Sequence, residues 1–240
     1  MIVRNSLLNY KNAYIYQDTE YFKMSMDSML LADFVTINMR DKKILDIATG
    51  NAPIPMLLTY RTKAKIYGVE IQREVFNLGK VSIKENNMNN QIELINDDAK
   101  NLVNVFESDT FDVITCNPPY FNTKNDKYEN DNKIKSLARH ERALALEDVF
   151  VISRKLLKNN GRLAIVHRTE RFVEIISTAR KYNFELKRVR FVYPKKSKNS
   201  DLVLLEFVLN GKTGLKMLPP LFVYDDNGKY TLEVSKMFGE

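Results

Sequence analysis

Strand-like apolar runs alternate with amphipathic helical stretches along the middle of the chain, and this alternation constrains the fold most. The strand-like runs occupy residues 42–48, 65–69, 92–96, 111–116 and 162–167, and the helical patterns occupy residues 55–61, 72–86, 147–157 and 170–181. Such alternation predicts a parallel sheet with helices on both faces. Two last runs, 186–192 and 202–209, predict an antiparallel strand pair at one edge. The expected fold class is therefore α/β and Rossmann-like, with a seven-stranded, mostly parallel sheet.

A chain of 240 residues is long enough to bury a sizeable core in one domain. The strands place the core at residues 42–209, after an N-terminal segment, 1–41, that we expect to form a helical cap. Residues 210–240 would form a C-terminal extension. The long polar stretch 121–136, rich in Asn and Lys, does not fit the alternation and predicts a functional or disordered loop.

The composition narrows the class of protein and its compartment. No run approaches the roughly 20 apolar residues of a membrane helix, and the N-terminus carries no apolar signal core, so no membrane partner is expected. The sequence contains one cysteine, Cys116, and two histidines, so we expect neither an internal disulfide nor a metal site. This composition is consistent with a protein of the reducing cytoplasm. The sequence leaves the oligomeric state unknown, with a monomer favoured.

Charge is distributed unevenly between the two halves of the chain. Residues 1–120 carry 13 Lys and Arg against 15 Asp and Glu, whereas residues 121–240 carry 24 against 15. A near-neutral half joined to a basic half indicates a catalytic core with a surface for a polyanion such as nucleic acid. A solvated basic face would give the same numbers, so both interpretations stay open.

Polar residues follow the ends of successive predicted strands. Asp46 and Gly50 come at the end of the first, Glu70 ends the second, Asp98 follows the third and Asn117 follows the fourth. Open parallel sheets bind ligands outside the carboxyl ends of their strands, so these residues are expected to share one site. Capping of strand ends is the alternative role for the acids.

The motif Asn117-Pro118-Pro119-Tyr120 stands directly after the fourth strand. The prolines remove two backbone donors, which leaves carbonyl oxygens facing a substrate. The Asn117 side chain and the Pro118 carbonyl could each accept one N–H of an amino group, and Tyr120 could stack on a base. A proline turn that closes a strand is the alternative. The motif matches the NPPY motif of methyltransferases that act on amino groups.

Residues 40–170 as a whole resemble class I S-adenosylmethionine-dependent methyltransferases. The resemblance implies S-adenosylmethionine as cofactor, with Glu70 on the ribose hydroxyls and Asp98 and Ala99 on the adenine. Asp46, Gly50 and Asn117 would complete the cofactor-binding set. The glycine loop departs from the usual D-x-G-x-G-x-G, because Ala48 and Ala52 replace two of its three glycines; alanine is costly wherever the backbone needs a positive φ.

Further segments, 22–34, 138–141, 190–194, 202–206 and 219–221, in this order resemble the bacterial tRNA1(Val) adenine-37 N6-methyltransferase family. The resemblance spans about residues 15–235 and implies tRNA as the partner, with an adenine beside the anticodon as the methyl acceptor. An anticodon-loop base is single-stranded and therefore easy to extrude. The residues expected to bind this substrate are Tyr120, Arg139, His140, Arg190, Lys195 and Lys196. His140 is expected to orient the substrate or support structure, because this chemistry needs no histidine.

Three other functions stay open at this point. A protein glutamine methyltransferase acting on release factors could carry the same motif, although the polar segment 121–136 fits a peptide groove poorly. A DNA adenine methyltransferase would need a sequence-reading domain, for which the residues after the fifth strand leave little room. A non-catalytic RNA-binding protein with a degraded cofactor site would explain Ala48 and Ala52.

Overall fold

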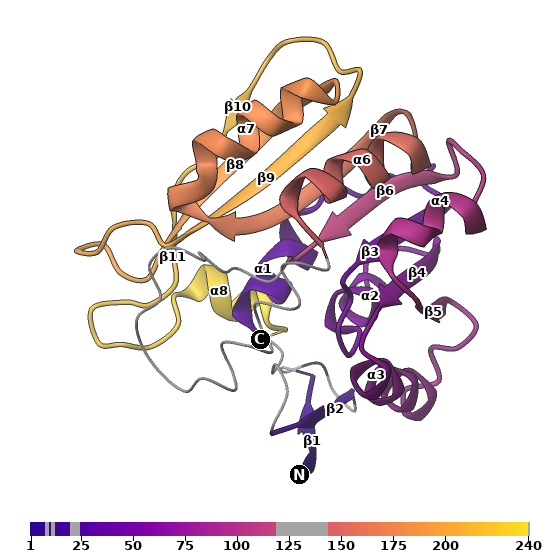
Figure 1. Cartoon of the computed structure of the whole chain (residues 1–240). Coiled ribbons are helices and arrows are strands. Elements are labelled where there is room, and N and C mark those ends of the chain that lie inside the picture. Colours follow the sequence, from indigo (N-terminus) through magenta and orange to yellow (C-terminus); the bar gives the residue numbers. More distant parts are fainter. Residues whose placement is uncertain (8–9, 11–12, 20–24, 119–143, 240) are drawn as a thin grey trace, which may run out of the picture.

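The computed structural model describes residues 1–7, 10, 13–19, 25–118 and 144–239, and these form a central twisted sheet covered by helices (Figure 1). The main sheet has the strand order β10-β8-β9-β7-β6-β3-β4-β5, and β11 also pairs with β8. Its long strands are β3 (Lys43–Ile47), β4 (Lys65–Glu70), β5 (Ile92–Asn96), β6 (Phe111–Cys116), β7 (Leu157–Arg168), β8 (Phe184–Tyr193) and β9 (Leu202–Leu209).

Strands β5, β4, β3, β6 and β7 run parallel, and β9 is antiparallel to both β7 and β8. The predicted mostly parallel sheet with an antiparallel terminal pair is therefore confirmed, and two short strands raise the number of strands from the predicted seven to nine. The two-residue strands β10 (Lys216–Met217) and β11 (Leu221–Phe222), which were not predicted, pair with the outer side of β8. They cover part of a sheet edge that would otherwise present unpaired backbone groups.

Apolar side chains leave the strands toward both faces of the sheet, so the core has two halves. Ile44, Ala164 and Val166 pack in one half, and Leu45, Leu163 and Ile165 pack in the other. Successive residues of a strand point to opposite faces, and parallel strands buried on both faces therefore need apolar residues at nearly every position. This requirement explains why the strands read as continuous apolar runs in the sequence.

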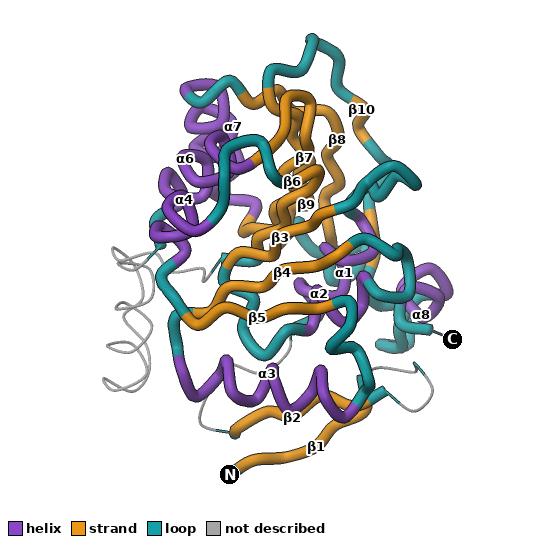
Figure 2. Tube along the Cα trace, turned by 90° about the vertical axis from the view of Figure 1, so that its right-hand side faces the viewer, coloured by secondary structure: helices purple, strands orange, loops and turns teal. Residues whose placement is uncertain are grey.

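Helices cover each face (Figure 2). The half of the core that contains Ile44 is covered by α1 (Met26–Phe34), α2 (Pro53–Leu58) and α8 (Leu232–Met237). The half that contains Leu45 is covered by α4 (Leu102–Val105), α6 (Leu146–Leu156) and α7 (Phe172–Lys181). Helix α3 (Arg73–Glu85) lies beside β5, and the short 3-10 turns η1 (Ala99–Asn101) and η2 (Thr169–Arg171) precede α4 and α7. In α3 the buried positions Val75, Leu78, Gly79, Ser82 and Ile83 recur at helical spacing. Within the described residues, no helix is long and apolar enough to cross a membrane.

The N-terminal segment differs from the expected helical cap. Strands β1 (Ile2–Ser6) and β2 (Tyr14–Asp18) form an antiparallel pair, and α1 is the helix that the described part of residues 1–41 contains. In β2, buried Ile15 and Gln17 alternate with half-buried residues, which is the period of a strand and not of a helix. The prediction is therefore correct for α1 and wrong for the pair β1–β2.

The β1–β2 pair is fastened to the rest of the molecule through backbone groups of β2. Asn86 donates to the Tyr14 carbonyl (2.7 Å) and accepts from the Tyr14 N–H (2.9 Å). The Tyr16 N–H donates to Ser82 Oγ (2.9 Å), and its carbonyl accepts from Asn51 Nδ2 (2.8 Å). The N-terminal strands therefore rest on α3 and on the loop after β3.

Candidate active site

The carboxyl ends of the parallel strands meet at one edge of the sheet. The register pairs Ile47 with Val69 on one side and with Cys116 on the other, so β3, β4 and β6 end side by side. The strand order reverses between β3 and β6, because β4 follows β3 on one side while β6 lies on the other. Open α/β sheets bind their ligands at such a reversal. The predicted site residues Asp46, Gly50, Glu70, Asp98 and Asn117 lie at this edge.

The loop between β3 and α2 turns through three left-handed residues. Ala48 has φ 55°, Gly50 φ 60° and Ala52 φ 71°. The Thr49 N–H donates to the Val69 carbonyl (2.9 Å) and the Ala52 N–H to the Thr49 carbonyl (3.0 Å), which holds the turn against β4. A Cβ added to Gly50 would meet nothing within 4 Å. The two alanines thus keep the conformation that glycines would adopt, and open space remains beside Gly50.

Ala48→Gly is expected to stabilise the protein slightly. An alanine in the left-handed region costs roughly 1–2 kcal/mol, while glycine loses about 0.5–1 kcal/mol through the entropy of the unfolded chain. The net gain at half-buried Ala48 is about 0.5 kcal/mol, measurable as an increase in the urea midpoint. Ala179→Gly, at a buried position in the last turn of α7, is the control and should lose about 1 kcal/mol or more. An Ala48→Gly loss as large as that of the control would contradict the assigned conformation.

The Glu70 side chain stabilises the loop between β3 and α2. Its Oε2 accepts from the Gly50 N–H (3.0 Å) and its Oε1 from the Gln72 N–H (2.8 Å). The backbone carbonyl of Glu70 accepts from Asn96 Nδ2 (2.8 Å), which ties the ends of β4 and β5 together. Burial raises the pKa of this carboxyl, and the backbone donors partly offset that effect. Each carboxylate oxygen has a further lone pair, so Glu70 can brace the loop and still accept from ligand hydroxyls.

Asp46 is fully buried at the end of β3. Its Oδ1 accepts from Thr115 Oγ1 (2.6 Å), whereas its Oδ2 has no hydrogen-bond partner among the described residues. Burial raises the pKa of the carboxyl to about 7, and the hydrogen bond from Thr115 acts in the opposite direction. A buried acceptor without a donor is costly to a fold. Asp46 therefore fits a site that a ligand with positive charge or N–H groups completes.

Asp46→Asn is expected to stabilise the ligand-free protein, and more so at higher pH. The unfolded carboxyl titrates near pH 4 and the folded one near pH 7, so folding retains a proton that the unfolded chain has released. The stability linked to that proton is complete below pH 4 and is lost as the pH rises to about 7. The advantage of the variant should grow by about 2–3 kcal/mol between pH 5 and pH 7 and then stay constant. Urea unfolding measures this, and an advantage independent of pH would refute the assignment.

Asp98 and Ala99 follow β5 as the sequence predicts. Asp98 caps η1, because its Oδ1 accepts from the Lys100 N–H (2.9 Å), and its Oδ2 lies 3.5 Å from Lys100 Nζ. Ala99 is buried. Asp97 supports the turn by accepting from the Asp98 N–H (2.7 Å) and from Asn101 Nδ2 (2.7 Å). The capping role is thus present, and the role of Asp98 toward an adenine ring stays a prediction.

Asn117 follows β6 at the point where the strand order reverses. Its side-chain Nδ2 donates to Ser28 Oγ of α1 (2.9 Å), and Ser28 is itself buried. Pro118 is also buried. The sequence analysis did not select Ser28, because no residue pattern links α1 to β6. Pro119 and three residues predicted to bind substrate, Tyr120, Arg139 and His140, lie outside the described residues.

The basic residues of the second half of the chain that were predicted to bind substrate, Arg190, Lys195 and Lys196, lie in different surroundings. Lys195 and Lys196 lie in the loop between β8 and β9, half-buried and exposed respectively. Arg190 instead donates to the Pro219 carbonyl (3.0 Å) and to Glu233 (2.7 Å), contacts that hold α8 against β8. Its guanidinium is thus already engaged within the protein, which makes Arg190 a weaker candidate for a phosphate contact than the two lysines.

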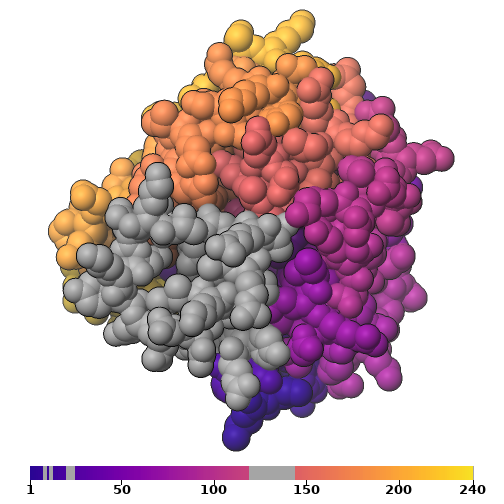
Figure 3. Space-filling view, viewed as in Figure 1, coloured from indigo at the N-terminus to yellow at the C-terminus, as the bar shows by residue number. Residues whose placement is uncertain are grey.

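The β8–β9 loop lies at the same edge of the sheet as Asn117. The register pairs Leu202, at the start of β9, with both Arg168 at the end of β7 and Val192 near the end of β8. The C-terminal extension runs beside this loop, since the Tyr224 N–H donates to the Pro194 carbonyl (2.9 Å). Figure 3 shows orange and yellow atoms next to each other at the left of this face.

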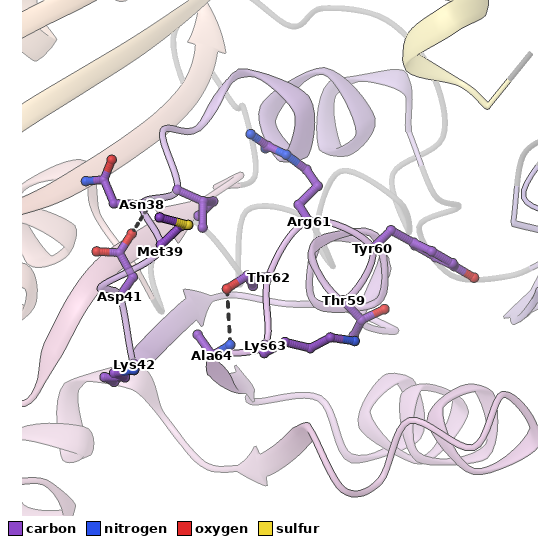
Figure 4. A pocket seen from close by; sticks show the side chains of 11 residues that line it. Asn38, Met39, Asp41, Lys42, Thr59, Tyr60, Arg61, Thr62, Lys63 and Ala64 are labelled. Carbon is purple, nitrogen blue, oxygen red and sulfur yellow. Dashed lines mark hydrogen bonds between the residues drawn. The ribbon is translucent and has the colours of Figure 1, made fainter.

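A separate hollow of about 510 Å³ lies at the opposite edge of the sheet (Figure 4). It is lined by residues that precede β3 and β4, including Met39, Lys42, Lys63 and Ala64. Polar strand-end residues such as Asp46, Glu70 and Asn117 do not line it. This hollow is therefore distinct from the candidate active site.

The family model described as a methyltransferase domain matches residues 38–208, and the chain belongs to this methyltransferase family. More particularly, the chain is similar to proteins named tRNA1(Val) (adenine(37)-N6)-methyltransferase. The relative from Flavobacterium psychrophilum is 26% identical, over 82% of this chain and 84% of the relative. The relative from Haemophilus influenzae is 28% identical, over 94% of each. A solved structure of a predicted O-methyltransferase from Agrobacterium tumefaciens has the same fold, with a TM-score of 0.72 and 19% identity over 89% of this chain and 95% of that one.

Proposed function

We propose that the protein is an S-adenosylmethionine-dependent methyltransferase that methylates the exocyclic N6 amine of an adenine in tRNA. The observation that carries the proposal is the position of Asn117, directly after β6 at the strand-order reversal and next to the carboxyl end of β3. This is where an open α/β sheet offers a ligand crevice. The relatives named for adenine-37 of tRNA1(Val) make that nucleotide the proposed acceptor.

The strand ends offer donors and acceptors suited to S-adenosylmethionine. Glu70 can accept from ribose hydroxyls, Asp98 and Ala99 can bind the adenine edge, and the space beside Gly50 admits a close approach of ligand to backbone. The Oδ2 atom of buried Asp46 can accept from a cationic or N–H-bearing ligand. The cofactor supplies an electrophilic methyl group on a positively charged sulfur.

The residues after β6 prepare the adenine amine for attack. That amine is a poor nucleophile because its lone pair is delocalised into the ring. The Asn117 amide oxygen and the Pro118 carbonyl can each accept one of its N–H groups, which aims the nitrogen lone pair at the methyl carbon. On transfer, the amine would gain the methyl group that the cofactor's sulfur gives up, and it would lose one proton to solvent. Tyr120 remains the proposed stacking surface for the base.

The basic loop supports tRNA as the substrate. Lys195, Lys196 and Lys198 lie between β8 and β9, at the sheet edge that carries Asn117. Phosphates of an RNA loop that places a base at Asn117 would meet these side chains. Arg139 and His140 are the further proposed substrate contacts. We propose a monomer with a single catalytic domain that works in the cytoplasm, where buried Cys116 remains a free thiol.

The test incubates the protein with S-adenosylmethionine and an unmodified tRNA1(Val) transcript, followed by digestion to nucleosides and mass spectrometry. N6-methyladenosine should appear, and a transcript with guanosine in place of adenosine 37 should give none. A glutamine-bearing peptide of release-factor type serves as the competing substrate. Methylation of that peptide, or absence of N6-methyladenosine across a whole tRNA pool, would overturn the proposal.

A further inference from the structure

Ser28 joins the N-terminal helix to the proposed catalytic asparagine. Its Oγ accepts a hydrogen bond from Asn117 Nδ2 (2.9 Å), and 6% of the serine is exposed. The two residues are 89 positions apart in the chain and come from α1 and from the end of β6. A neutral hydrogen bond within a buried site both orients its partners and is costly to lose.

Three arginines donate hydrogen bonds to backbone carbonyls at and just after the C-terminus of α1. These bonds fix the position of the helix, and with it the position of Ser28. Arg61 donates to the carbonyls of Ala32 and of Val35, the latter at 3.0 Å. Arg188 donates to the Phe34 carbonyl (3.0 Å), and Arg162 to the Thr36 carbonyl (3.1 Å). The last carbonyls of a helix lack partners within the helix and attract cations.

Glu206 completes this support from β9. Its carboxylate accepts from the Thr36 N–H (2.6 Å) and from Arg188 (3.2 Å), and the residue is buried. Helix α1 also contacts β7 and β9, and Figure 1 shows it lying against the sheet near the end of β6. The position of Ser28 relative to β6 is therefore set by the core, independently of substrate.

The chemistry of an amide makes this contact important. An asparagine side chain has one donor end and one acceptor end, and rotation by 180° exchanges them. Only the orientation with Oδ1 toward the substrate can accept from an adenine amine; the reverse would place two donors against each other. Because Ser28 Oγ accepts from Nδ2, the Oδ1 end is turned away from α1.

We infer that Ser28 is a positioning residue that anchors the Asn117 amide by its Nδ2 end and so presents Oδ1 to the substrate. The inference rests on the proposed function and extends it to a residue of the N-terminal helix. Ser28 would act through Asn117, without touching the reacting atoms. Its loss should therefore reduce the rate of methyl transfer more than the binding of cofactor or tRNA.

The first experiment compares Ser28→Ala with Ser153→Ala. Ser153 is also a buried helical serine, and its Oγ has no hydrogen-bond partner among the described residues. Under single-turnover conditions with saturating tRNA and cofactor, Ser28→Ala should lower the rate about tenfold, while the Kd for S-adenosylmethionine changes less than about twofold. Ser153→Ala should keep the normal rate. An unchanged rate in Ser28→Ala, or a loss confined to cofactor affinity, would overturn the inference.

The second experiment repeats Ser28→Ala in an Asn117→Asp background. A carboxylate has two equivalent acceptor oxygens, so it presents an acceptor to the amine whichever way it is turned, even without an anchoring serine. The effect of Ser28→Ala on the slow single-turnover rate should then fall from about tenfold to less than about twofold, a non-additivity that general loss of structure would not produce. A tenfold effect in this background would also overturn the inference. If Asn117→Ala kept normal turnover, the proposed function of Asn117 would fail instead, which separates the two failures.

Discussion

Asn117→Ala is expected to reduce methyl transfer to tRNA by at least about 10²-fold while the affinity for S-adenosylmethionine changes less than about threefold. The amide accepts from the amine and aims its lone pair, and removal of one positioned polar group of this kind costs about 10²–10³ in kcat. The cofactor-binding candidates Asp46, Glu70 and Asp98 come from β3, β4 and the turn after β5, which the substitution leaves intact. Single-turnover assays measure the rate and calorimetry measures the cofactor affinity.

Asn104→Ala provides the matched control for this variant. Asn104 is exposed on α4 and belongs to neither the strand ends nor the basic loop. Its loss should leave both the rate and the affinity unchanged. If Asn117→Ala retained the normal rate, the chemical role proposed for the residue would be wrong; if it instead lost cofactor binding, Asn117 would belong to the cofactor site.

The seven long strands of the sheet could be predicted from the sequence because each of them carries a local signal. The bounds of β5 and β6 agree with the prediction at every residue, and both strands are short apolar runs flanked by polar turns. The strand-end position of Asp46, Glu70 and Asp98 followed directly, since parallel strands bring their carboxyl ends together. Local pattern was thus sufficient for the long strands of the main sheet and for the strand-end position of the candidate site residues.

Contacts between segments that are distant in the chain have no comparable signal in the sequence, so they could not be predicted. In the sequence, Ser28 is one polar residue of the largely buried helix α1, and its bond to Asn117 depends on how α1 packs against the sheet. The replacement of two glycines by Ala48 and Ala52 was evident in the sequence, but the left-handed backbone that these alanines keep was not, because alanine rarely adopts it and the surrounding turn imposes it. Arg190 was predicted from its charge and from its place in segment 190–194, and neither reveals its partner Glu233.

The charge of the β8–β9 loop makes a second large effect measurable. Replacement of Lys195, Lys196 and Lys198 by glutamine is expected to weaken tRNA binding about 10- to 100-fold at low salt. Each lysine that neutralises one phosphate releases a counterion and contributes about −0.7 to −0.9 to the slope of log K against log salt concentration. The triple variant should therefore have a slope smaller in magnitude by about 2–3, and its affinity should approach that of the wild type at high salt. Filter binding across a salt series gives both quantities.

A control with the same loss of net charge separates a local contact from a general electrostatic effect. Lys42, Lys43 and Lys63 are exposed near the amino ends of β3 and β4, at the edge of the sheet opposite Asn117. Their replacement by glutamine also removes three positive charges. Screening confines the field of an exposed charge to roughly 10 Å at ordinary ionic strength, so charges at the far edge should contribute little to the slope. Equal slopes for the two triple variants would mean that the tRNA senses net charge and not this loop, and the docking of tRNA across the carboxyl edge of the sheet would have to be abandoned.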